Sequence, residues 1–283
     1  QSYLSDRSQV VAIGEELSEE VKLKEGTAQG SSCSCTLFAL FVGDAGLWAC
    51  KSLILAYADD TFITVTGNTR EELIANLESE GDTILNFFSA NKMVSNPEKT
   101  GLLIFRPSSS KEHAEKVTIT VGGVNISESD DERVLGVQIQ SDLKFDKHIG
   151  KLKQGLQYCL SILARLRKIM GRKEVTMIAN GLFMSKLRYC LPVFASEHLR
   201  INQCDSESSL IHGLQICQND MLRIITGKNR SDKKRISDML AETKMLSVNQ
   251  LTAHVMMMMM MIMMMMMMMM METWKAREFL GFF

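Results

Sequence analysis

The chain has 283 residues, of which 46% are hydrophobic, and its formal net charge is −1. This composition supplies enough apolar material for one large folded domain or two small ones, and it excludes a chain that is disordered throughout. The charge is unevenly distributed. Residues 1–143 carry 11 Lys and Arg against 22 Asp and Glu, whereas residues 144–188 carry 11 against 2. Such a basic block indicates a polyanionic partner, although a set of solvated helix faces explains it almost as well.

The seven cysteines include no Cys-x-x-Cys pair, and the first residues, 1–7, lack the apolar core of a signal peptide. We therefore expect an intracellular protein, nuclear or cytoplasmic and not secreted, that has no disulfide framework. Histidines and cysteines also gather between residues 198 and 217, but their gaps fit no familiar zinc site. Because the chain opens on Gln1 rather than Met, we expect a piece of a longer protein.

In chain order, short apolar pairs from Val10 to Leu23 predict strand and turn. Residues 25–32 form a Gly/Ser-rich loop, and the apolar stretch at 37–42 predicts a buried helix. Next comes Tyr57-Ala58-Asp59-Asp60, which lies between apolar runs at 53–56 and 62–65. That pattern predicts a strand, a tight turn and a second strand, with two adjacent carboxylates at the bend.

Paired carboxylates at a bend suit Mg²⁺, which prefers one or two carboxylates together with substrate phosphates. Two such ions serve phosphoryl transfer in many enzymes. A solvated turn is the simpler interpretation of Asp59-Asp60 alone, so the neighbouring motifs have to decide between the two.

Thr69 and Glu72 form a capping box that opens a helix with an apolar face, and Asn91 ends this helix. A turn is predicted at 96–100. Strands are predicted at 102–105, at 117–121 before a Gly-Gly turn, and at 134–139.

From Lys147 the apolar residues recur every three or four positions, which predicts a long helix that Gly171 stops. A second helix is predicted from Glu174 to Tyr189, closed by Pro192, and a third over 210–225. Basic residues occupy the other faces of these helices, namely Lys151, Lys153, Arg165, Arg167, Lys168, Arg172 and Lys173.

The 17 residues from Val255 to Met271 are nearly all Met. Their number lies at the lower edge of what spans a bilayer, about 17–25 residues, and no Lys/Arg flank marks an orientation. A membrane span is therefore disfavoured. We expect instead a helix with a sticky apolar surface that allows self-association.

The order of these segments resembles the back half of the reverse transcriptase of non-LTR (LINE-type, jockey-like) retrotransposons. Residues 28–31 (Ala-Gln-Gly-Ser) resemble the family's Pro-Gln-Gly-Ser segment, and residues 57–60 match its catalytic hairpin. Asn96 with Lys99-Thr100 resembles the next motif, and Leu135-Gly136-Val137 resembles the primer-grip strand. Taken singly, Lys99 could be an ordinary surface lysine and Gln29 an ordinary loop glutamine. The resemblance therefore depends on the order of the motifs along the chain.

The resemblance implies an α+β fold. Residues 1–143 would form a partial polymerase palm, an antiparallel sheet with packed helices, without the fingers and the strand that carries the first catalytic Asp. Residues 144–245 would form a basic α-helical thumb and connection. Residues 246–283 would form a helical C-terminal tail that contains the Met run.

The resemblance also implies roles for the motif residues. Asp59 and Asp60 would hold two Mg²⁺ ions and act in catalysis, with Lys99 as the general acid. An RNA template, a DNA primer and deoxynucleoside triphosphates would be the partners. Gln29, Gly30, Ser31 and Tyr57 would place template and nucleotide, Leu135 and Gly136 would grip the primer, and the seven basic residues named above would bind backbone phosphates.

Departures from the family pattern bear on activity. Nothing ahead of Ala28 resembles the strand with the third carboxylate, Ala28 replaces the usual Pro, and Cys33-Ser34-Cys35 replaces a Leu/Pro-containing stretch. We therefore predict a reverse transcriptase fragment that does not polymerise DNA. The alternatives are a catalytically silent nucleic-acid-binding module, and a protein that self-associates or is tethered to a membrane through the Met run.

Overall fold

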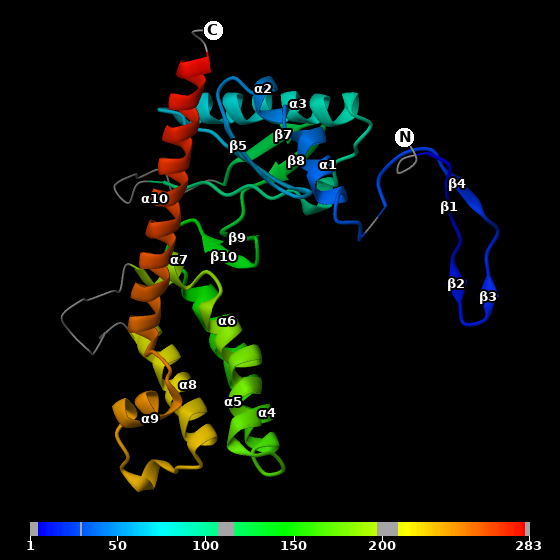
Figure 1. The fold of residues 1–283 in the computed structure, drawn as a ribbon. Helices are drawn as coiled ribbons and strands as arrows, with labels where there is room; N and C mark the ends of the chain where they lie inside the picture. Colours follow the sequence, from blue (N-terminus) through cyan, green and yellow to red (C-terminus); the bar gives the residue numbers. More distant parts are fainter. Residues whose placement is uncertain (1–4, 29, 107–115, 197–208, 281–283) are drawn as a thin grey trace. The chain divides into compact units, whose positions relative to one another are not determined.

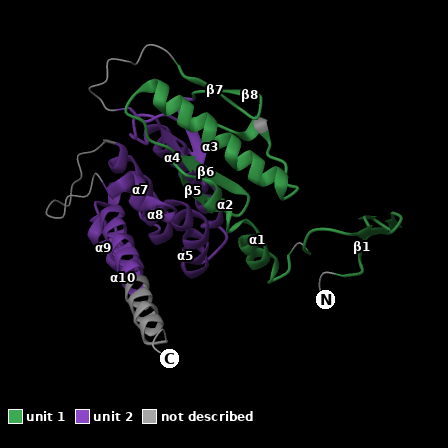
Figure 2. Ribbon diagram, turned by 90° about the horizontal axis from the view of Figure 1, so that it is seen from above, with its two compact units in different colours: residues 1–102, 109–128 green, residues 103–108, 129–283 purple. Residues whose placement is uncertain are grey.

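The computed structural model describes residues 5–28, 30–106, 116–196 and 209–280, with side chains described as far as residue 265. The chain divides into two compact units (Figure 2). Unit 1 comprises residues 1–102 and 109–128, and unit 2 comprises residues 103–108 and 129–283. Within the described residues, every sheet consists of two antiparallel strands. The expected mixture of helices and antiparallel strands is confirmed.

Unit 1 opens with two short strand pairs. Strand β1 (Arg7–Gln9) pairs with β4 (Val21–Leu23), and β2 (Ala12–Ile13) pairs with β3 (Glu16–Leu17). This confirms the strand-and-turn pattern predicted for the first segment of the chain.

Helices α1 (Ser34–Val42) and α2 (Ala45–Trp48) follow, then strands β5 (Leu53–Tyr57) and β6 (Asp60–Thr64). The helix predicted at 37–42 is present, but the expectation that it is buried is wrong, because α1 has no buried residue. Apolar composition marks a helix here without placing it in the core of the unit.

The long helix α3 (Arg70–Ala90) organises unit 1. Thr69 Oγ1 accepts a hydrogen bond from the Glu72 amide at 3.2 Å, while the Glu72 carboxylate accepts from the Asn68 amide at 2.9 Å. Asn91 ends the helix, and its backbone amide donates a hydrogen bond to the Phe87 carbonyl at 3.1 Å. Thr69 is therefore confirmed as the N-cap and Asn91 as the end, whereas the return bond of the predicted capping box is made to Asn68 rather than to Thr69.

Helix α3 packs against the hairpin of β7 (Thr118–Val121) and β8 (Val124–Ser127) (Figure 1). The amides of Thr120 and Gly122 donate to Glu78 and Asp82 of α3, each at 2.8 Å. Phe87 of α3 is fully buried, so this helix carries the apolar centre of the unit.

Replacing Thr69 by alanine removes the side-chain acceptor at the start of α3, so we expect unit 1 to lose about 1 kcal/mol of unfolding free energy. Urea unfolding at constant pH measures the change as a lower transition midpoint. Thr69→Ser keeps the hydroxyl and serves as the control. An equal loss in both variants would contradict the capping role.

One of the predicted strands is wrong, and another is correct only in part, since residues 137–139 lie in a strand. At 102–105, only Leu102 forms a single parallel bridge, to Glu128. At 134–139, the chain instead turns between β9 (Asp131–Val134) and β10 (Val137–Gln140). Leu135 and Gly136 have φ angles of +47° and +87°, which lie in the left-handed region and break a strand.

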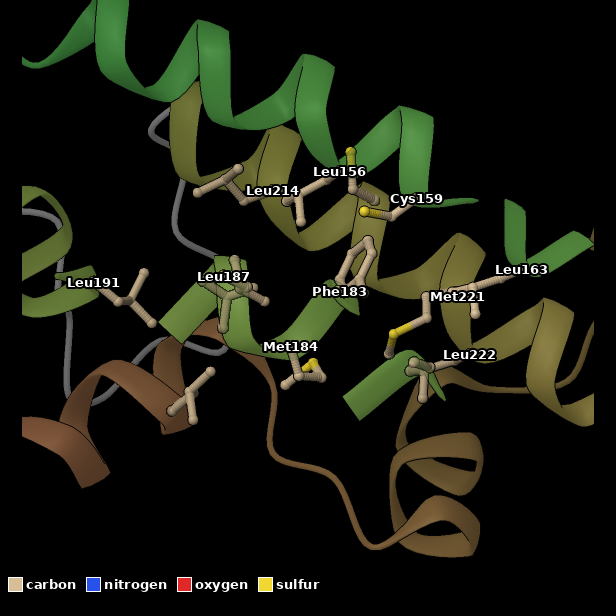
Figure 3. Packing of buried hydrophobic residues seen from close by; sticks show 14 of the residues in the cluster. Leu156, Cys159, Leu163, Phe183, Met184, Leu187, Leu191, Leu214, Met221 and Leu222 are labelled. Carbon is tan, nitrogen blue, oxygen red and sulfur yellow. The ribbon is translucent and has the colours of Figure 1, made fainter. Parts of the chain in front are cut away.

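Unit 2 is mainly helical. Its elements after β10 are α4 (Asp146–Leu166), α5 (Arg172–Ala179), a π-helical turn (Asn180–Met184), α6 (Ser185–Arg188), α7 (Leu191–Ala195), α8 (Ser209–Thr226), α9 (Ile236–Thr243) and α10 (Val248–Leu280). Figure 3 shows side chains from several of these helices meeting in one core, with Leu156, Phe183, Leu214 and Met221 among its fully buried members. The apolar period predicted for the first long helix therefore marks its buried face correctly.

The second predicted helix differs from the observed one in two ways. The π-helical turn interrupts it between α5 and α6. Pro192, which was predicted to close a helix, instead lies in the first turn of α7. A proline is tolerated there because the first helical N–H groups have no intrahelical acceptor.

Candidate nucleic-acid interface

The acidic hairpin has the predicted form. Strands β5 and β6 pair from Leu53↔Thr64 to Tyr57↔Asp60, which leaves Ala58 and Asp59 as a two-residue turn. Ala58 has a φ angle of +51°, the positive value that the first central residue of such hairpin turns requires. Asp59 and Asp60 are both exposed at the tip of the hairpin.

The described residues do not complete a site for two Mg²⁺ ions. Paired ions carry four positive charges, and Asp59 with Asp60 supplies two negative ones. No group of three or more His, Cys, Asp or Glu within the described part of the chain is arranged to hold a metal ion. The acidic pair therefore fits only part of a two-metal site.

Tyr57 pairs with Asp60 across the hairpin, but no bond joins the other predicted polymerase residues of the described part of unit 1 to this pair. Gln29 lies outside the described residues. Gly30 has a φ of +81° in the turn before α1, and the amide of Ser31 donates to the Ala28 carbonyl at 3.3 Å. Lys99 is exposed at the end of a 3₁₀ turn within the predicted turn at 96–100. Among the hydrogen bonds and ion pairs of the described residues, none links Ser31 or Lys99 to either aspartate.

In unit 2, the turn between β9 and β10 is fixed to the helices by two ring-bearing side chains. Tyr189, directly after α6, donates its hydroxyl to the Leu135 carbonyl. Its ring lies beside Gly136, where an added Cβ would approach the ring to 3.4 Å. His148 Nδ1 of α4 accepts from the Gln138 amide at 3.3 Å. The predicted primer-grip residues therefore sit in a left-handed turn that two helices hold.

The surroundings of His148 favour its neutral form, and a hydrogen bond defines the tautomer of that form. Burial, and then the positive charge of Lys151, hold the pKa of this imidazole below its ordinary value. Since Nδ1 accepts a hydrogen bond, the proton of the neutral ring is on Nε2. The ring also packs edge-on against Phe194 of α7, with centroids 4.9 Å apart.

A pocket opens beside this turn. It is lined by Arg133, Gly136, Gln138, His148, Lys151, Leu152, Gly155, Lys186 and Tyr189. Three of these residues are cationic, and none of the described residues that line the pocket is an Asp or Glu. The glycine at 155 faces open space, so it leaves room for a ligand against α4. Such a site favours an anion.

The first 139 residues match the family model for reverse transcriptase (RNA-dependent DNA polymerase). This segment, about half of the chain, is therefore similar to the reverse transcriptase family. The chain is also 25% identical, over 234 residues, to the probable RNA-directed DNA polymerase from transposon BS of Drosophila melanogaster. This alignment covers 80% of the chain and 25% of that protein, so the chain spans about a quarter of the relative's length. No solved structure matches the chain.

These findings confirm the resemblance to a retrotransposon reverse transcriptase, and the LINE-type subclass is consistent with them. The family match ends inside β10. The pocket is therefore lined both by residues within the matched segment and by residues after it. Arg133, Gly136 and Gln138 come from the reverse transcriptase segment. Lys151 and Lys186 come from helices beyond it.

The seven basic residues predicted to bind phosphates do not share one face. At about 100° per residue, Lys151 and Arg165 lie on one side of α4, and Lys153 lies roughly opposite. The Lys153 side chain passes Gly213 of α8, within 3.5–3.8 Å of where a Cβ would stand on that glycine. Arg172 forms an ion pair with Glu242, a carboxylate that also pairs with Lys234. Of the seven, Lys151 alone is among the described residues that line the pocket.

Sequence reasoning missed several lining residues of the pocket. Gln138 lies in the segment predicted as a strand, Arg133 lies directly before that segment, and Lys186 lies in the basic block without having been selected. In the sequence, Gly136 was the signal that could have identified Arg133 and Gln138. A glycine turn there would bring the residues on its two sides close together. The remaining lining residues come from far along the chain, as the bond between Leu135 and Tyr189 shows.

Proposed function

We propose that this chain is a nucleic-acid-binding part of a non-LTR retrotransposon reverse transcriptase that does not itself polymerise DNA. The single observation that supports the proposal most is the pocket at the β9–β10 turn, which Arg133, Lys151 and Lys186 line together with no Asp or Glu among the described lining residues. The phosphate backbone of an RNA template–DNA primer duplex is the ligand proposed for it.

The roles taken from the resemblance belong to the complete polymerase. There, Asp59 and Asp60 would hold Mg²⁺, which would activate the primer end and neutralise the triphosphate. Lys99 would protonate the leaving pyrophosphate. Gln29, Gly30, Ser31 and Tyr57 would place the template and the deoxynucleoside triphosphate. Within the described residues, Asp59 and Asp60 are not joined by the further carboxylate that this chemistry would need.

Inactivity follows from the incomplete acidic site. Phosphoryl transfer depends on positioning, and a misplacement of about 1 Å costs about a hundredfold in rate. We therefore expect no primer extension by the purified chain on an RNA template with Mg²⁺ and all four deoxynucleoside triphosphates. Extension that Asp59→Asn abolishes would overturn the proposed inactivity while leaving the binding site standing.

Binding to the pocket should be strongly salt-dependent. Each neutralised phosphate of a duplex contributes about −0.9 to the slope of log affinity against log salt. A double variant, Lys151→Gln with Lys186→Gln, removes two of the three cations. We expect binding of a fluorescein-labelled RNA–DNA hybrid to weaken about tenfold or more at low salt, and the slope to become shallower by about 2. Fluorescence anisotropy at several salt concentrations measures both quantities.

The matched control is Lys153→Gln with Lys168→Gln. It removes the same charge from α4 and the segment after it, but from residues that do not line the pocket. We expect the control to bind like the unchanged chain. If both double variants lose affinity equally, the basic helices act as a diffuse surface and the pocket is not the site. If the unchanged chain does not bind the hybrid at all, the proposed function fails.

A further inference from the structure

Helix α10 changes character along its length. At its base, Val248, Leu251 and Thr252 are buried, and the helix packs against α7 and α8 within unit 2. Farther on, every side chain from Met257 to Met265 is 49–63% exposed. Figure 1 shows the helix (orange to red) continuing beyond α8 and α9. One helix is therefore anchored in the core at one end and presents apolar side chains to solvent at the other.

The exposed part is apolar on every side. Nine consecutive residues at about 100° each cover the full circumference of a helix more than twice. No Asp, Glu, Lys or Arg occurs from Val255 to Met271. A helix that is hydrophobic all round is normally buried in something. Because it carries no charge, this segment suits neither the phosphate backbone of a nucleic acid nor a polar partner.

The length of the run favours another protein surface over a bilayer. One helix, Val248–Met265, is apolar and long enough to be a candidate membrane span. That window, however, includes Val248, Leu251 and Thr252, which are already buried in the core of unit 2. The run left over, 256–271, is about 24 Å long at 1.5 Å per residue, whereas the apolar core of a bilayer is about 30 Å thick.

We propose that the run from Met256 to Met271 pairs with the same run of a second copy of this chain and makes the protein a dimer. A second copy carries an uncharged helix of the same length, so no polar group of either partner is forced into the contact. Met side chains are flexible enough to fill the gaps of an interface that has no periodic pattern of its own. The proposed contact therefore depends on the length and apolar character of the run rather than on specific side-chain pairs.

The proposal is independent of nucleic-acid binding. The test is multi-angle light scattering of the full chain after size exclusion, in detergent-free buffer with 0.5 M salt and no nucleic acid. The unchanged chain should have twice the monomer mass at tens of micromolar. The variant Met258→Glu, Met260→Lys, Met263→Glu, Met265→Lys places charges on opposite sides of the helix without changing the net charge. Its mass should fall by half.

The matched control is Met177→Glu, which changes an exposed Met of α5 outside the run and should stay dimeric. Circular dichroism should give the same helical signal for all three proteins, since all the changed side chains are exposed. If the quadruple variant unfolds, titration of the unchanged chain with a mild non-ionic detergent should still convert dimer to monomer. A monomeric unchanged chain, a dimeric folded quadruple variant, or flotation of the unchanged chain with phosphatidylcholine vesicles would each overturn the proposal.

Discussion

Replacing Phe183 by alanine should lower the unfolding free energy of unit 2 by about 3–5 kcal/mol. The ring of Phe183 is fully buried in the π-helical turn between α5 and α6. Figure 3 shows it among Leu156 and Cys159 of α4 and Met221 of α8. Removing the ring leaves a cavity in a close-packed core, and neighbouring side chains can fill it only in part.

Urea unfolding followed by the far-ultraviolet circular dichroism of the full chain measures this loss, since most of the described helix lies in unit 2. Phe105→Ala is the matched control, because Phe105 belongs to the same unit and is 52% exposed. The control should change the unfolding free energy by less than about 0.5 kcal/mol. Similar losses in the two variants would show that the core is not centred on Phe183.

The elements that could be predicted from sequence are those fixed by local patterns. The cap at Thr69, the acidic hairpin at 57–60 and the apolar face of α4 each depend on residues within a few positions of one another. Local hydrogen bonds and helical periodicity determine such features, and a single sequence displays both. The basic block after residue 143 was likewise visible as a run of charge.

The features that sequence did not reveal depend on contacts between distant segments. The left-handed turn at Leu135-Gly136 is held by Tyr189, 54 residues along the chain from Leu135. The position of each lysine on α4 relative to the pocket depends on where the β9–β10 hairpin packs, which no local pattern states. The prediction that α1 is buried was wrong for the same reason. Its apolar residues indicated a place in the core, but the fold builds its core from other segments.

A buried carboxylate, also missed from sequence, anchors the acidic hairpin in unit 1. Glu80 of α3 is 4% exposed and accepts hydrogen bonds from the Ser52 hydroxyl at 2.6 Å and from the amides of Cys50 and Lys51 at 3.3 and 3.2 Å. These three residues lead directly into β5, the first strand of the hairpin that carries Asp59 and Asp60. Glu80 therefore ties that strand to the longest helix of the unit.

Replacing Glu80 by glutamine should lower the unfolding free energy of unit 1 by about 2 kcal/mol at neutral pH, since hydrogen bonds to charged groups contribute about 1.5–3 kcal/mol. The hydrogen bond from Ser52, helped by the amides of Cys50 and Lys51, holds the pKa of Glu80 below its ordinary value although burial opposes this shift. A carboxylate with a lowered pKa in the folded state stabilises the fold at pH values above its unfolded pKa. The contribution disappears as the pH falls through the folded pKa.

The stability difference between the unchanged chain and Glu80→Gln should therefore be constant from neutral pH to about pH 5, and then shrink with further acidification. Trp48 reports on unit 1, because its ring packs against Phe87 at 5.5 Å. A Trp274→Phe background leaves it as the single tryptophan of the chain. Urea unfolding followed by this fluorescence at several pH values measures the difference, with Glu98→Gln as an exposed control. If the difference grew on acidification, or matched that of the control, the anchoring role of Glu80 would be wrong.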